Sequence, residues 1–184
     1  HIDHYGGIQG VLTQDELADP SLSLDEQIAS GKTAIIVPDG FENAVMSENV
    51  FVGTAMKRRS LYQYGSVIQP GEQGRLSVGI GLAVSQGEVG YLSPTFNVTE
   101  EVFETTIDGV KVIFQLTPDT ESPAEMNTYF PDKKALWLAE NCTASMHNIY
   151  TLRGAEVRDA NSWARYITEA QSLFGKDAEV VFQS

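Results

Sequence analysis

Residues 103–116 read FETTIDGVKVIFQL, and this stretch decides which kind of fold the chain can adopt. Apolar and polar side chains alternate on both sides of Asp108-Gly109, with the period of two that is typical of a half-buried strand. The Asp-Gly dipeptide readily supplies the positive φ angles of a two-residue turn. The stretch therefore predicts an antiparallel β-hairpin over 103–116.

Three runs outside this hairpin predict short buried strands. TAIIV at 33–37 is rich in β-branched residues and stops at Pro38-Asp39-Gly40, which is a turn signal. ALWLA at 135–139 and EVVF at 179–182 are equally short and apolar. Each of these two runs leads directly into polar residues, so the strand ends are candidate places for chemistry.

The last third of the chain contains the clearest helical pattern. Residues 159–174 carry apolar side chains at helical spacing, and Gly175 follows as a C-cap. The apolar positions are Trp163, Ile167, Ala170 and Phe174. This pattern predicts an amphipathic helix that packs against the strands.

The first half of the chain has weaker helical signals and many glycines. Residues 41–61 favour a helix that Gly53 weakens, and 24–29 favours a short helix in an otherwise polar loop. A common face of the longer helix would hold Phe41, Val45, Val52, Ala55 and Met56. The glycine-rich stretch 62–97 favours loops and brief strands.

Composition and charge limit the fold class and the partners. The 184 residues with 42% hydrophobic content suit one domain, and the mixed pattern predicts an α/β or α+β layered architecture. The net charge of −13 argues against nucleic acid and anionic membranes as partners. No apolar run reaches the roughly 18 residues of a membrane span. The lone Cys142 provides no disulfide framework and fits either a periplasmic or a cytoplasmic location.

Several side chains that suit a divalent metal ion stand at the chain start and after two predicted strands. His1, Asp3 and His4 offer two imidazoles and a carboxylate within four residues, although so short a string also occurs by chance. Glu121 and Glu140 follow apolar strands and could face one cleft. The alternative is that both glutamates are ordinary solvated turn residues.

A histidine and two arginines lie close together further along the chain. His147 precedes Arg153 by six residues, which suggests a proton donor beside an anion clamp. The other interpretation is that His147 is a structural histidine and that an arginine here, Arg153 or Arg158, only pairs with Asp159 or Glu156.

Taken in order, four segments resemble the alkyl sulfatase family of the metallo-β-lactamase superfamily. HIDHYGG at 1–7 resembles the end of the superfamily's T-H-x-H-x-D-H string. SENVFVGTAMKRRSLYQYG at 47–65, TPDTESPAEM at 117–126 and AENCTASMHNIYTLRGAEVRDANSW at 139–163 resemble long family segments. Asp119 stands where the family has a glycine. The resemblance implies a metallo-β-lactamase-like αββα sandwich.

The resemblance also implies a binuclear zinc centre that hydrolyses alkyl sulfates to an alcohol and inorganic sulfate. His1 and Glu121 would bind the first ion, Asp3 and His4 the second, and Glu140 would bridge both. His147 would be the general acid and Arg153 the sulfate clamp, with Tyr64 and Asn97 as further sulfate contacts. Glu125 would support the ligands without binding metal. The metal ions would lower the pKa of a bridging water towards neutrality.

Two family histidines that complete the zinc ligands fall outside residues 1–184. The resemblance therefore implies part of a single catalytic domain, truncated at both ends, that binds zinc weakly by itself and belongs to a protein that can form a homodimer. One alternative is another hydrolase of the superfamily, such as a lactamase or thioesterase, although most of these have a histidine at the position of Glu121. The other alternative is an inactive piece that lacks two ligands.

Overall fold

The structure is a computed structural model that describes residues 2–79, 81–83, 87–145 and 147–183. Its helices are α1 Ile2–Tyr5, α2 Leu24–Ala29, α3 Phe41–Met46, α4 Gly53–Gln63 and α5 Ala160–Phe174, with a π turn at Ser47–Phe51 and 3-10 turns at Ile8–Gly10, Gln14–Glu16 and Pro131–Lys133. Its strands are β1 Ile36–Pro38, β2 Phe96–Val98, β3 Val102–Ile107, β4 Val110–Leu116, β5 Met126–Phe130, β6 Ala135–Trp137 and β7 Val180–Phe182.

The main sheet has five strands in the order β3-β4-β5-β6-β7. The first four strands are antiparallel neighbours, and β7 pairs parallel to β6. Because β5 lies antiparallel between them, β4 and β6 run in the same direction. Their carboxyl ends therefore meet at one edge of the sheet, which is where Glu121 and Glu140 follow.

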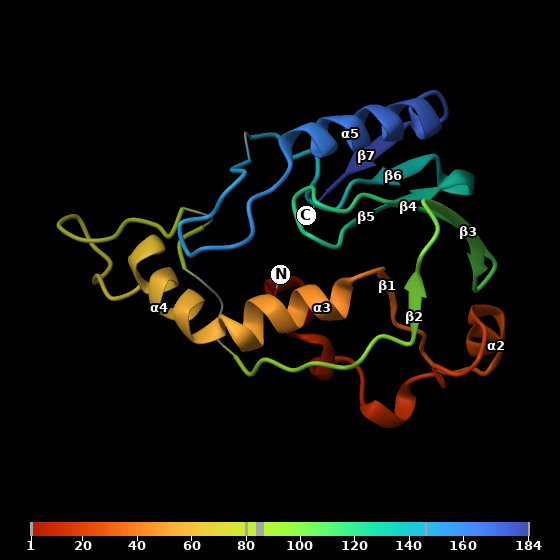
Figure 1. Ribbon diagram of the computed structural model, residues 1–184, viewed down its shortest axis with the longest axis horizontal. Coiled ribbons are helices and arrows are strands. Elements are labelled where there is room, and N and C mark those ends of the chain that lie inside the picture. The colour runs from red at the N-terminus through yellow and green to blue at the C-terminus, as the bar shows by residue number, and fades with distance from the viewer. Residues whose placement is uncertain (1, 80, 84–86, 146, 184) are drawn as a thin grey trace.

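Two apolar clusters lie against the main sheet. One joins the sheet to α5, and within it the rings of Tyr129 and Phe174 stack with centroids 4.8 Å apart. The other joins the hairpin to β2 through Val98, Val112 and Phe114. Figure 1 shows α5 along the sheet, with β1 and β2 as a separate parallel pair. The fold is α+β, as the sequence predicts.

The hairpin is confirmed with the predicted turn. Ile107 pairs with Val110 across Asp108 and Gly109, whose φ angles are 49° and 79°. Both central residues thus adopt the left-handed conformation that a type I′ turn requires.

Three predicted strands differ from the structure in length or burial. The run 33–37 contains a strand only from Ile36, and that strand extends through Pro38, because β1 pairs only where β2 lies beside it. The run 135–139 ends its strand at Trp137, whose side chain is 40% exposed and stacks on Phe182. Strand β7 forms as predicted, but its side chains are exposed because it lies at the sheet edge.

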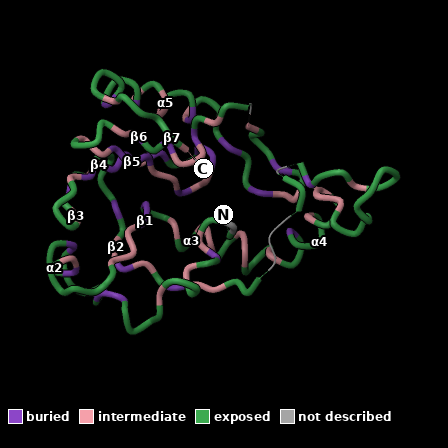
Figure 2. Tube along the Cα trace, turned by 180° about the vertical axis from the view of Figure 1, so that it is seen from behind, coloured by how far each residue is buried: buried purple, intermediate pink, exposed green. Residues whose placement is uncertain are grey.

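The predicted helix over 41–61 is interrupted. A π turn over Ser47–Phe51 separates α3 from α4, and α4 begins at Gly53. On the expected apolar face only Met56 is buried, whereas Val52 and Ala55 are exposed. Figure 2 shows α4 and the loop after it as mostly exposed, while buried segments follow the main sheet.

The two other predicted helices are confirmed. Helix α2 spans the predicted 24–29, and α5 begins after Asp159 and ends at Phe174 with Gly175 as its C-cap. Among the described helices, none combines the length and the hydrophobicity needed to cross a bilayer.

Candidate metal centre

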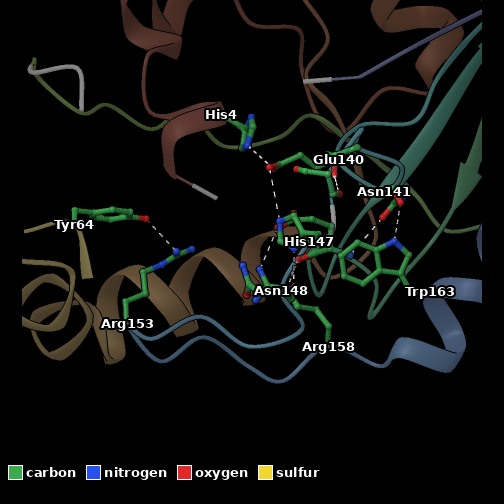
Figure 3. Close-up of polar contacts among 12 residues, drawn as sticks. His4, Tyr64, Glu140, Asn141, His147, Asn148, Arg153, Arg158 and Trp163 are labelled. Atoms are coloured by element: carbon green, nitrogen blue, oxygen red, sulfur yellow. Dashed lines mark hydrogen bonds and ion pairs between the residues drawn. The ribbon is translucent and has the colours of Figure 1, made fainter. Parts of the chain in front are cut away.

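Two glutamates and two histidines from four chain segments converge beside the main sheet. Glu121 follows β4, Glu140 follows β6, His147 lies in the loop before α5, and His4 lies in α1. One ligand atom from each of Glu121, Glu140 and His147 lies within 4.8 Å of the others. His4 joins this group because its Nε2 lies 3.0 Å from Glu140 Oε2. Figure 3 shows His4 and His147 on either side of Glu140.

His147 lies between the two carboxylates. Its Nε2 is 3.5 Å from Glu121 Oε1 and 4.0 Å from Glu140 Oε1. Its other ring nitrogen, Nδ1, lies 2.7 Å from the carbonyl oxygen of Asn148. A proton on Nδ1 would donate to this carbonyl, which fixes the ring and directs Nε2 towards the glutamates.

The crowding of carboxyl groups changes their acidity. Burial, followed by the charge of Glu140, raises the pKa of Glu121, and Arg158 and His147 only partly offset this effect. The hydrogen bond from His4 lowers the pKa of Glu140. Burial, followed by the charge of Glu121, raises the pKa of Glu125 to about 7. A bound cation would relieve this repulsion, so the donor set suits a divalent metal ion.

The backbone next to both glutamates adopts left-handed angles. Asp119 has a φ of 60° and Ala139 a φ of 49°. Left-handed backbone is unfavourable for most non-glycine residues, and such positions cluster at functional sites. The resemblance implies a glycine at the position of Asp119, and aspartate tolerates this conformation better than most non-glycine residues do.

Buried polar side chains that the sequence analysis did not single out hold the two glutamate loops together. Asn141 Oδ1 accepts a hydrogen bond from the Glu121 N–H at 3.3 Å, and Asn141 Nδ2 donates to Thr117 and Asn127. Trp163 Nε1 of α5 donates to the carbonyl oxygen of Asn141 at 2.8 Å. The signal that the sequence offers for this role is the position of Asn141 directly after Glu140.

Two of the three residues expected to bind sulfate, Arg153 and Tyr64, contact each other. Arg153 Nη1 lies 3.3 Å from the hydroxyl of Tyr64, and Gln63 Oε1 accepts the Arg153 N–H at 2.8 Å. Figure 3 shows this pair to one side of the cluster around His147. Arg153 is thus held at the end of α4 by Gln63 and Tyr64.

The remaining predicted site residues lie elsewhere or outside the described part. Asn97 lies in β2, exposed, in register with Val37. His1 lies outside the described residues, and so does the side chain of Asp3.

Two cavities adjoin the cluster. One of about 320 Å³ has His4, Glu121, Glu125 and Glu140 in its wall, together with mostly apolar residues such as Phe41. The other, of about 340 Å³, is lined by His147, Cys142 and residues of α5. Side chains of the cluster therefore line two spaces that are large enough for small molecules.

Comparison with known proteins gives close relatives, although no family model matches. The chain is 44% identical to an alkyl/aryl-sulfatase of Saccharomyces cerevisiae, covering 98% of this chain and 26% of that protein. It is 40% identical to a linear primary-alkylsulfatase of Pseudomonas sp., covering 99% of this chain and 25% of that protein. A solved stereoselective inverting sec-alkylsulfatase from Pseudomonas sp. matches 100% of this chain and 27% of its own, with 35% identity and a TM-score of 0.86.

The helices and sheets define an α+β protein that matches the solved sec-alkylsulfatase over the whole length of this chain. Within that class, the chain is 36–44% identical to three named alkyl or alkyl/aryl sulfatases over 98–100% of its own length. It spans about a quarter of the length of the curated relatives it matches.

Proposed function

We propose that the full-length protein hydrolyses alkyl sulfate esters to an alcohol and inorganic sulfate at a zinc centre. The observation that carries this proposal is the convergence of Glu121, Glu140 and His4 at one sheet edge, in a chain 44% identical to a named sulfatase. By resemblance, His1 and Asp3 complete the ligands that this chain contributes to two zinc ions.

The donor set supports this assignment. Imidazole and carboxylate donors suit zinc, and two neighbouring carboxylates are far more stable beside a cation than alone. Burial, followed by the charge of Glu140, raises the pKa of Glu121, and a cation beside it would act against both effects. Bound zinc would neutralise the carboxylates and make hydroxide available near neutral pH.

The contacts of the other residues support the roles that we propose for them. His147, held through Nδ1 by Asn148, can hold a proton on Nε2 and donate it to the ester oxygen of the substrate. Arg153 offers a planar fork that suits a tetrahedral oxyanion, and Tyr64 beside it adds a hydroxyl donor. Asn97 remains a further candidate for sulfate binding.

An assay of sulfate release tests the proposal. The full-length protein should release inorganic sulfate from dodecyl sulfate, lose this activity on chelation, and regain it with zinc. Glu121→Gln should remove most of the activity, while Glu104→Gln, an exposed glutamate of the hairpin, should leave it unchanged. Turnover of a lactam without sulfate release would indicate the other hydrolase class instead.

The role of His147 has its own test. His147→Ala should lower turnover of dodecyl sulfate by roughly 10²-fold, the usual effect of losing a general acid. Zinc content, measured by mass spectrometry, should stay at the wild-type value. A loss of zinc in this variant would reassign His147 as a metal ligand, and full turnover would remove it from the mechanism.

A further inference from the structure

Arg158 is a buried arginine whose side chain is directed at one residue of the candidate metal centre. It is only 6% exposed. Its Nε donates to the main-chain carbonyl of Glu121 at 2.6 Å, and its Nη2 donates to Glu121 Oε1 at 3.1 Å. A single guanidinium therefore contacts both the backbone and the carboxylate of Glu121.

This double contact restricts Glu121 in two ways. The bond to the carbonyl fixes the chain at Glu121, and the bond to Oε1 fixes the direction of the side chain. Asn141 holds the N–H of the same residue at 3.3 Å, so the backbone of Glu121 is bound on both sides. The planar fork of arginine can make both contacts at once, whereas a lysine ammonium is a point charge.

Arg158 is itself fixed by main-chain bonds. Its N–H donates to the carbonyl of Ile149 at 2.9 Å, in the segment that carries His147 and Arg153. The next residue, Asp159, donates its N–H to the Asp119 carbonyl at 3.1 Å, in the turn before Glu121. Arg158 thus connects the Glu121 loop, the His147 segment and the start of α5.

The positive charge of Arg158 also stabilises the Glu121 carboxylate in this position. Glu121 is buried, and the nearby charge of Glu140 makes its ionised form less stable. Arg158 supplies a buried positive charge within an ion-pair distance of 3.1 Å. Without it, the buried carboxylate would lose its ion-pair partner and would rotate away from this position.

We infer that Arg158 is a positioning residue that holds the Glu121 carboxylate in the orientation that a metal ion requires. The inference rests on the proposed function, since it takes Glu121 as a metal ligand. Groups that orient metal ligands typically change metal affinity by 10- to 100-fold when they are removed.

The test compares zinc affinities of full-length variants by competition with a chromophoric chelator. Arg158→Ala should bind zinc about 10- to 100-fold more weakly than the wild type. The matched control is Arg165→Ala, which removes an exposed arginine from α5 and should leave zinc affinity unchanged. Equal zinc affinity in both variants would overturn the inference.

Chemical rescue separates positioning from a general loss of structure. Ethylguanidinium should restore much of the zinc affinity of Arg158→Ala, because it can replace both donors in the vacated space. Ethylurea, a neutral analogue of similar shape, should not. Equal rescue by both, or by neither in a folded variant, would contradict the assigned role.

A second variant covers the case in which Arg158→Ala does not fold. Arg158→Lys keeps the charge but loses the fork, so zinc should bind several-fold more weakly, and wild-type affinity would overturn the inference.

A wild type that binds zinc in an Arg158-dependent way without releasing sulfate would refute only the proposed function. Sulfate release with unaltered zinc affinity in the Arg158 variants would refute only the inference, and a wild type without zinc would refute both.

Discussion

At the scale of single residues, Glu125 is a carboxyl group whose ionised form is destabilised by burial and by two neighbouring carboxyl groups. It lines the cavity beside Glu121 and Glu140, and burial with their charges raises its pKa from 4.5 to about 7. Between these two pH values the folded chain keeps a proton that the unfolded chain releases. Stability should therefore fall as pH rises through this window.

Replacing Glu125 by glutamine should remove this pH dependence. In the chelated full-length protein, Glu125→Gln should raise the free energy of unfolding at pH 8 by up to about 3 kcal/mol, since each pKa unit corresponds to about 1.4 kcal/mol. At pH 5 the gain should shrink to below about 1 kcal/mol. Urea unfolding at both pH values measures the difference.

The control for this prediction is the exposed Glu104→Gln, which should change stability by less than about 0.5 kcal/mol at either pH. A gain in Glu125→Gln that is the same at pH 5 and pH 8 would show that Glu125 is not held in a protonated state.

The residues of the site differ in how far the sequence predicts them. Glu121 and Glu140 were identifiable because each follows an apolar strand, and the sheet order then brings the ends of β4 and β6 together. Arg158 and Asn141 were not identifiable as supports of Glu121. Their contacts join residues 37 and 20 positions apart, and local sequence patterns carry no information on such pairs.

At the scale of elements, the sequence correctly predicts the features that depend only on residues close together in the chain. The turn at Asp108-Gly109 and the cap of α5 depend on a few neighbouring residues, and both form as predicted. The length of β1 and the exposure of β7 depend instead on which strand lies beside them. For this reason the sequence predicts the existence of these strands better than their bounds or burial.

Helix α5 is capped at its start and contacts the candidate metal centre through its first turn. Asp159 caps the helix by accepting hydrogen bonds from the N–H groups of Asn161 and Ser162. Trp163, in the first turn, donates a hydrogen bond from Nε1 to the carbonyl oxygen of Asn141. Asp159→Ala should lower the free energy of unfolding by about 1 kcal/mol, the usual effect of losing an N-cap. Chemical denaturation of the full-length protein measures it.

Two further variants control this prediction. Asp159→Asn keeps an oxygen acceptor and should lose much less stability. Asp177→Ala removes an exposed aspartate just beyond the same helix, where no capping bond is at stake, and should have little effect. An equal loss in Asp159→Ala and Asp177→Ala would show that the cap does not stabilise α5.

At the scale of the whole molecule, the net charge of −13 and the chemistry of the site are compatible. The acidic side chains proposed to bind a cation are gathered at one sheet edge, whereas Arg153 extends towards the end of α4, where Tyr64 lies. The molecule thus keeps a candidate cation site and a candidate anion site in adjacent parts of the fold. Net charge alone reveals neither of them.

The most direct test of this account is anomalous scattering at the zinc absorption edge from crystals of the full-length protein. Zinc peaks are expected about 2 Å from carboxylate oxygens of Glu121 and Glu140 and from a ring nitrogen of His4. His147 and Arg153 are expected not to coordinate the metal. Zinc bound only at other residues, or Glu121 and Glu140 with no metal between them, would contradict it.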